Sequence, residues 1–367
     1  MNAPATGAQP SQQGTRPPRR WRGWQPLRLL SLFLGLALLV LLLRQVGLGT
    51  LVAHARQLGW TFLATVALFA GVHLLRTISW RLCLQEDRRQ LPFRRALSLW
   101  LAGEAVAHLS FGWSGDAFRA AASSQTIPVE RGLSALLASR IVYFYSTIVL
   151  MTASFMLGFF LLPPQAVIRP LLAAASVPLL AISVLPLTGR PIVTPLLNRF
   201  SSYLARHSHS AFLRRLQIFV TALEHDLAAA FLHSKRNFAR LAGLNFLATF
   251  AGVLEVYLIL RGLGADVSLI TACLVEGIGK TLGVFALVVP GNVGVREGGM
   301  TLIFQLFEMS AALAVTLVLA QRARALVWVG IGSLVMILHG VSPASPERHS
   351  RGSKNKRFLN QSPHTRS

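Results

Sequence analysis

The sequence predicts an all-α, polytopic membrane protein with about six full spans, two re-entrant hairpins of broken helix and an inverted internal repeat. Three observations carry this prediction. The 367-residue chain is 53% hydrophobic and only 13% charged, a composition typical of integral membrane proteins rather than soluble domains. Two long apolar segments are interrupted by glycine-rich, charged stretches. These stretches share features at a separation of about 180 residues, which indicates an internal duplication.

The amino-terminal part predicts a tail followed by a membrane anchor. Residues 1–28 are rich in Pro, Gln, Gly and Arg and predict a disordered basic tail. The apolar run Leu29–Leu43 predicts the first span and opens a transmembrane domain over residues 29–340. A cleaved signal peptide is the alternative, because Ala53-His-Ala55 resembles a cleavage site. That site lies far beyond the apolar run, which favours the anchor.

The second predicted span, Trp60–Trp80, carries His73 and Arg76 in its interior. Such residues are rare inside spans, and they commonly pair or face a polar cavity. A cluster of arginines follows the span directly. Positive charge concentrates on the cytoplasmic side of membrane proteins, so we expect this loop to be cytoplasmic. The arginines are Arg81, Arg88, Arg89, Arg94 and Arg95.

The first broken segment, Ser110–Arg119, follows the apolar arm Ala96–Leu109. Hydrocarbon offers no partners for backbone N–H and C=O groups, so a break is tolerated only inside protein or beside a wet cavity. Charged groups at such a break are costly and usually functional. The candidates on this arm and segment are Glu104, His108, Gly115, Asp116 and Arg119.

Four further apolar segments predict spans, and a basic segment at residues 190–240 links the two halves. The halves are residues 60–188 and 241–340, and residues 341–367 form a basic tail without a fold of its own. The span at Leu133–Leu162 exceeds the hydrocarbon thickness, so it should tilt or protrude. The other predicted spans are Pro170–Leu187, Leu241–Leu260 and Ser310–His339.

The second broken segment, Val288–Gly299, lies between the apolar segments Leu269–Leu287 and Met300–Phe307. Its proline, Pro290, removes a hydrogen-bond donor, and its glycines loosen the backbone. Arg296 and Glu297 place two charges beside this break. A short extramembrane turn between two spans is the alternative interpretation. The glycines singled out as candidates are Gly291 and Gly294.

The internal repeat is seen in three features that occur in the same order in both halves. Gly112 and Gly115 have the spacing of Gly291 and Gly294, and an acid and a base lie beside each pair. Further on, the sequence Leu-Ala-Ser-Arg140 is echoed by Leu-Ala-Gln-Arg322 within a second long apolar helix. Duplicated halves with broken helices are typical of secondary transporters.

Counting crossings predicts the topology. If both broken segments are re-entrant, both termini, the arginine-rich loop after the second span and residues 190–240 all face the cytoplasm. The first hairpin then opens to the cytoplasm and the second to the outside, so the halves are inverted. We expect a multi-pass protein of a bacterial-type plasma (inner) membrane.

The net charge of +23 indicates contact with anionic lipid headgroups and not with nucleic acid. The two cysteines, Cys83 and Cys273, lie far apart at or within apolar segments, which predicts neither a disulfide framework nor a zinc site. We expect no metal and no cofactor. The sequence leaves the oligomeric state open.

The second broken segment resembles a family signature. The residues Pro290-Gly291, Gly294 and Arg296-Glu297 match the P-G-x-x-G-x-R-E motif of the lysylphosphatidylglycerol synthase transmembrane (flippase-like) family, which includes hopanoid-biosynthesis-associated membrane proteins. Gly115-Asp116 to Arg119 is similar to its G-E-x-x-R motif, with Asp116 at the usual glutamate position and Phe111 where a proline is common. The resemblance covers about residues 27–340 and implies the membrane half without the soluble aminoacyl-transfer domain.

A lipid flippase or carrier is the function that the residues and the resemblance favour. The planar guanidinium groups of arginines would bind a phosphate-bearing headgroup through two parallel hydrogen bonds. The acids would hold those arginines or contact an amine. The lipid is a phospholipid, a hopanoid or a polyprenyl-linked glycolipid. The expected path consists of Glu104, His108, Gly115, Asp116, Arg119, Arg140, Pro290, Gly291, Gly294, Arg296, Glu297 and Arg322.

Two other classes of function are weighed against transport. In an intramembrane enzyme acting on a lipid headgroup, Glu104 and His108 would serve as acid and base. No nucleophile–base motif, phosphate loop or metal cluster accompanies them, so we expect no catalysis. A scaffold for a partner glycosyltransferase would leave the intramembrane charges unexplained. A lipid- or glycan-biosynthesis enzyme is the expected protein partner.

Overall fold

The computed structural model describes residues 48–109, 114–161, 168–184, 235–285 and 295–339, with short pieces between 199 and 225. Within these ranges the chain is helical and contains no strand, which confirms the all-α prediction. The predicted first span Leu29–Leu43, both tails and most of the 190–240 linker lie outside the described residues.

Among the described residues, four helices are long and apolar enough to cross a membrane, and each corresponds to one predicted span to within a few residues. The predicted span at Pro170–Leu187 corresponds to a shorter helix, α6 (Ile168–Val184), which packs along α5. Large apolar side chains such as Phe160, Leu171 and Ile337 are exposed on the protein surface, as expected of residues that face acyl chains. The four long helices are α2 (Leu48–Cys83), α5 (Val129–Leu161), α9 (Lys235–Gly262) and α12 (Ala311–Leu338).

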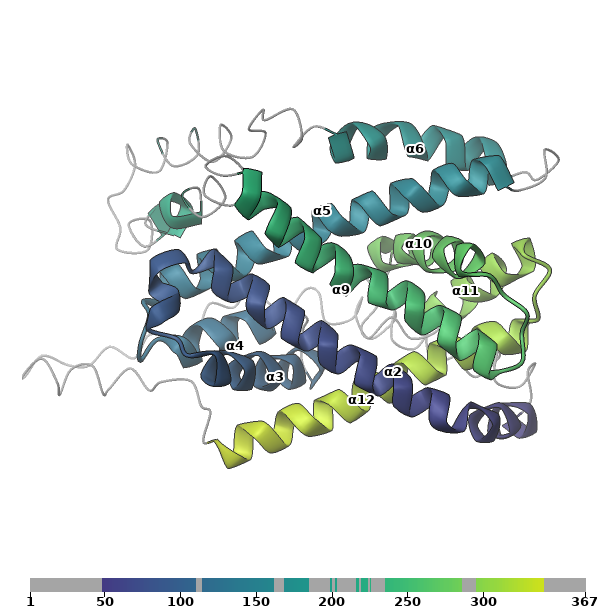
Figure 1. Ribbon diagram of the computed structural model, residues 1–367, viewed down its shortest axis with the longest axis horizontal. Helices are drawn as coiled ribbons and strands as arrows, with labels where there is room; N and C mark the ends of the chain where they lie inside the picture. Colours follow the sequence, from purple (N-terminus) through teal and green to yellow (C-terminus); the bar gives the residue numbers. More distant parts are fainter. Residues whose placement is uncertain are drawn as a thin grey trace, which may run out of the picture.

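The first broken segment forms a hairpin of two helices, α3 (Phe93–Leu109) and α4 (Ser114–Ser123). At the start of α3, Arg95 donates a hydrogen bond to Gln125 just after α4, with 2.9 Å between Nη2 and Oε1. Helix α4 therefore returns to the end of the bundle from which α3 starts (Figure 1). We call this end the first end; the short 3₁₀ helix η2 (Gln85–Arg89) also lies there.

The second hairpin, α10 (Leu269–Phe285) and α11 (Val295–Leu306), opens at the opposite end of the bundle. Leu263 and Val267, which precede α10, belong to the same apolar cluster as Phe307 and Met309, which follow α11. Figure 1 shows the α3–α4 pair and the α10–α11 pair displaced toward opposite ends. We call the end at which α10 starts the second end.

The equivalent long helices of the two halves, α2 with α9 and α5 with α12, run in opposite directions, so that α2 and α12 start at the same end of the bundle. His54 near the start of α2 hydrogen-bonds Thr316 near the start of α12, with 2.8 Å between Nδ1 and Oγ1. Near the end of α2, Ser79 accepts a hydrogen bond from Asn245 near the start of α9 at 2.7 Å. The colour gradients of α2 and α9, and of α5 and α12, run oppositely in Figure 1. This inversion is the arrangement that the sequence predicts.

A long helix of each half packs against the hairpin of the other half. Helix α12 packs on α3 of the first hairpin, and α5 packs on α10 of the second. Small residues permit both close approaches: a Cβ on Gly332 would lie 2.2 Å from the Leu101 carbonyl oxygen, and one on Gly277 would lie 1.9 Å from the Ser154 hydroxyl. Each hairpin is thus covered by the long helix of the other half.

Candidate functional site

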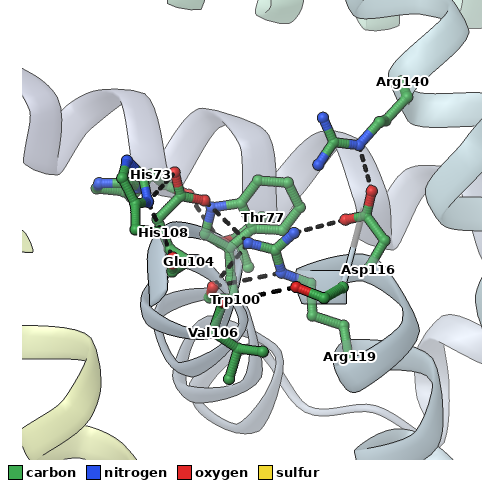
Figure 2. Close-up of polar contacts among 10 residues, drawn as sticks. His73, Thr77, Trp100, Glu104, Val106, His108, Asp116, Arg119 and Arg140 are labelled. Carbon is green, nitrogen blue, oxygen red and sulfur yellow. Dashed lines mark hydrogen bonds and ion pairs between the residues drawn. The ribbon is translucent and has the colours of Figure 1, made fainter. Parts of the chain in front are cut away.

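Arg119 of α4 forms the centre of a charge cluster on the first hairpin (Figure 2). Its side chain is 0% exposed. Its Nη1 lies 2.6 Å from Asp116 Oδ1, and its Nη2 lies 3.0 Å from Glu104 Oε2. These contacts compensate the buried charge, which would be strongly destabilising without a partner. The first cluster comprises Glu104, His108, Asp116, Arg119 and Arg140.

The arm helix α3 supplies the remaining contacts of Arg119. Both Nε and Nη2 donate hydrogen bonds to the Trp100 carbonyl oxygen, at 3.3 and 3.0 Å. The guanidinium also lies over the Trp100 ring, 4.0 Å from its centroid, a cation–π arrangement. Arg119 therefore holds α3 and α4 together.

Asp116 connects this hairpin to the following long helix. One carboxylate oxygen contacts Arg119, and the other accepts a hydrogen bond from Nε of Arg140 on α5. Asp116 is 2% exposed whereas the Arg140 side chain is 30% exposed. Part of the Arg140 side chain therefore lies outside the buried cluster.

Gly115 has a packing role at the crossing of α3 and α4. A Cβ at this position would lie 2.3 Å from the Gly103 carbonyl oxygen, and a Cβ on Gly103 would lie 2.5 Å from Arg119 Nε. Only glycine permits these contacts, since real Cβ atoms do not approach backbone so closely. Gly103 and Gly115 therefore allow α3 and α4 to approach closely around the Arg119 side chain.

His108 lies at the margin of the first cluster. Its Nδ1 is 3.8 Å from Glu104 Oε1 and 3.0 Å from the Glu104 carbonyl oxygen, and its side chain is 44% exposed. The Glu104 carboxylate makes its shorter contact with Arg119, at 3.0 Å. The predicted proximity of Glu104 and His108 is present, but the carboxylate is engaged mainly by the arginine.

A second cluster joins α11 to α9 and α12. Glu297 is fully buried and forms an ion pair with Arg322 Nε at 2.7 Å. Arg296 Nη2 donates to Gln321 Oε1 at 2.7 Å, and Gln321 Nε2 donates to the Glu255 carboxylate at 3.4 Å. The other Glu255 oxygen pairs with Arg324. The second cluster comprises Glu255, Arg296, Glu297, Gln321, Arg322 and Arg324.

The two clusters contain an equivalent acid–arginine pair. Asp116 and Glu297 are each the third residue of the helix that returns from the break. Arg140 and Arg322 are each the twelfth residue of the following long helix, and their side chains are 30% and 32% exposed. Each acid lies in a first helical turn, where the helix dipole favours negative charge. The predicted broken segments are therefore shorter than expected, because these charges belong to helices.

Cations outnumber acids in and around the two clusters. The two clusters, together with Arg76 of α2 and the Glu276–Lys280 pair of α10, contain seven Arg or Lys side chains and five acidic ones. In the described part of the chain, two of the seven, Arg76 and Arg296, form no ion pair with a carboxylate. Lys280 pairs with Glu276 one turn away at 2.7 Å, as their spacing predicts. The acids are Glu104, Asp116, Glu255, Glu276 and Glu297, and the other cations are Arg119, Arg140, Arg322 and Arg324.

Some predicted site residues are not placed, and some contacts were not predicted. Pro290, Gly291 and Gly294 lie outside the described residues. The sequence interpretation did not include Trp100 or Gln321, which link the charged groups. The identity of Gln321 beside Arg322 was visible in the repeat, but its partners come from other elements. Within the described ranges, no group of three or more His, Cys, Asp or Glu could hold a metal ion.

The fold and the clusters define a multi-pass helical membrane protein with paired charges on two opposed hairpins. The sequence model of a family described as the lysylphosphatidylglycerol synthase TM region matches residues 28–332. The chain belongs to this family, as the two sequence motifs predict. Comparison with curated proteins and with solved structures gave no match.

Proposed function

We propose that this protein translocates a lipid with a phosphate-bearing headgroup across the membrane. The observation that carries the proposal is the equivalent pairing of Asp116 with Arg140 and Glu297 with Arg322 on hairpins that open at opposite ends. Buried ionisable groups inside a membrane are costly and mark polar pathways. Inverted halves with interrupted helices are the architecture in which alternating access is common.

The excess of cations suits an anionic headgroup. Guanidinium groups bind phosphate through two parallel hydrogen bonds, and Arg296 donates to a neutral amide rather than to a carboxylate. The side chains of Arg140 and Arg322 are each partly exposed, whereas the acids that they contact are buried. A headgroup could therefore exchange contacts with these arginines while its acyl chains stay in lipid.

The acid–arginine pairs supply a simple two-state element. Asp116 and Arg140 join α4 of the first hairpin to α5, and Glu297 and Arg322 join α11 of the second hairpin to α12. The two hairpins open at opposite ends of the bundle. In the proposed cycle, phosphate competes with the acid for the arginine at one hairpin and loosens that hairpin. The equivalent pair at the other hairpin stays closed, so that the path opens on one side at a time.

The proposal places the protein in a bacterial-type inner membrane, with both termini in the cytoplasm and without catalysis in this chain. The intramembrane-enzyme alternative relies on Glu104 and His108, but the closest described partner of that carboxylate is Arg119. The scaffold alternative gives no role to the matched pairs. Membrane lipids are the proposed ligands, and a lipid- or glycan-biosynthesis enzyme is the proposed protein partner.

Substitution of Arg296 and Glu297 tests the function. In proteoliposomes that hold a fluorescent phospholipid, Arg296→Lys and Glu297→Gln should each slow flipping by about tenfold or more, because a charge-assisted hydrogen bond contributes about 1.5–3 kcal/mol. Flipping is measured as the fraction of lipid reached by an impermeant reductant. The yield of monodisperse protein should stay close to that of the wild type.

The control separates transport from folding. Arg169→Gln removes an arginine of α6 that lies over the Phe159 ring, 4.8 Å from its centroid, in neither cluster; flipping should be unchanged. Normal flipping in both test variants would contradict the proposal. A collapse of protein yield in both would show that the pair at Glu297 is structural.

A further inference from the structure

One face of α2 connects the two clusters. Phe69, His73 and Arg76 lie four and then three residues apart, so their side chains share one face of the helix. The Arg324 guanidinium of the second cluster lies over the Phe69 ring, 3.3 Å from its centroid. Arg76 lies 4.2 Å from the centroid of the Tyr143 ring on α5. The three residues span about 10 Å of the helix axis.

His73 lies in the middle of this face and is almost completely buried. It is 6% exposed, and its ring centroid is 4.5 Å from that of Trp328 on α12. Neither ring nitrogen has a hydrogen-bond partner in the described protein, and the Nε of Arg76 also has none. Buried polar groups in proteins are nearly always hydrogen-bonded. These nitrogens are therefore positioned to bind a ligand.

The electrostatic neighbours of His73 come from both clusters. It interacts with Glu104 and Arg119 of the first cluster and with Arg324 of the second. Glu104 in turn has electrostatic interactions with both His73 and Arg76, and Figure 2 shows His73 beside Glu104. The α2 face thus lies between the two groups of charges.

We propose that His73 and Arg76 form a central anion site that binds the phosphate group of the translocated lipid between the two clusters. Phosphate oxygens accept hydrogen bonds from the imidazole N–H and from the guanidinium. The aromatic rings of Tyr143 and Trp328 form its apolar walls. This inference rests on the proposed function, because it gives the headgroup a position midway along the path.

A binding measurement tests the site without depending on transport. The purified chain in detergent is mixed with phosphatidylglycerol or with diacylglycerol of the same acyl chains, and native mass spectrometry counts the bound lipid. We expect the wild type to prefer phosphatidylglycerol. Arg76→Gln should reduce this preference at least tenfold, and His73→Gln should reduce it severalfold. Arg76→Lys should retain part of it, because a single charge replaces a planar donor.

Arg169→Gln is the matched control, since that arginine also lies over an aromatic ring but belongs to α6. Its preference should equal that of the wild type. Inorganic phosphate is added in a second arm. Displacement of the lipid in the wild type would show that free phosphate also occupies the site, whereas no displacement would assign the site to the lipid headgroup alone.

The outcomes separate this inference from the proposed function. Undiminished preference in monodisperse Arg76→Gln and His73→Gln protein would overturn the central site, even if the wild type flips lipid. Loss of preference in these variants would support the site, even if the wild type fails to flip lipid in proteoliposomes.

Discussion

At the scale of single residues, the two arginines bound to Asp116 differ in burial. Arg119 is 0% exposed and contacts two carboxylates and a backbone carbonyl. Arg140 reaches the same aspartate from α5 with a side chain that is partly exposed. The first arginine is therefore enclosed by the hairpin, whereas the second keeps part of its side chain exposed.

This difference predicts unequal effects of two similar substitutions. Arg119→Gln should destabilise the protein by about 3–5 kcal/mol, because it leaves the Glu104 carboxylate without its arginine and Asp116 with Arg140 alone. Arg140→Gln should cost less, because water or lipid headgroups reach part of its side chain. Thermal unfolding in detergent compares the two variants. Equal stability losses would contradict the assignment of separate roles.

The sequence located the charged residues but not all of their partners. The repeat identified Arg140 and Arg322, because each recurs at the same place in a long apolar helix. Trp100 was not identified, since a tryptophan on an apolar arm resembles an ordinary core residue. Its contacts with Arg119 depend on the angle at which α3 and α4 cross. Such tertiary contacts leave no periodic signal in one chain.

At the scale of helices, the close approach of α12 to α3 determines how the two halves pack together. Helix α12 approaches α3 so closely that a Cβ on Gly332 would lie 2.2 Å from a backbone carbonyl oxygen. Two residues earlier, a Cβ on Gly330 would meet nothing within 4 Å. The spans were predictable from hydropathy. The crossing was not, because hydropathy does not identify the facing helix.

These glycines form a matched pair within one helix. Gly332→Ala should destabilise the protein by about 1–3 kcal/mol, since backbone must move to admit the methyl group. Gly330→Ala should be neutral or stabilising by up to about 1 kcal/mol, because alanine favours the helix. Thermal unfolding of both variants measures the difference. The packing of α12 on α3 would be contradicted if Gly332→Ala were tolerated as well as Gly330→Ala.

At the scale of the whole molecule, the two hairpins open at opposite ends of the helical bundle (Figure 1). The first end holds η2 and the starts of α3 and α9, and the second end holds residues 263–268. Arginines concentrate at the first end, so from the positive-inside rule we expect that end to face the cytoplasm.

Cysteine labelling tests this orientation. In a variant without Cys83 and Cys273, Gln90→Cys should escape an impermeant thiol reagent applied to intact cells, whereas Asp266→Cys should react. Both native side chains are exposed in the structure. Permeabilised cells provide the control, in which both cysteines should react. The reverse pattern in intact cells would invert the orientation, and labelling of both would contradict the assignment of the ends to opposite sides.

The most direct test of the central claim neutralises each equivalent acid separately. Asp116→Asn and Glu297→Gln are compared with the wild type for flipping of a fluorescent phospholipid in proteoliposomes, at matched amounts of monodisperse protein. If both hairpins take part in one path, each single substitution should reduce flipping by about tenfold or more. The double variant should then flip lipid only slightly more slowly than either single variant. Wild-type flipping in either variant, or no flipping by the wild type above empty liposomes, would contradict the account.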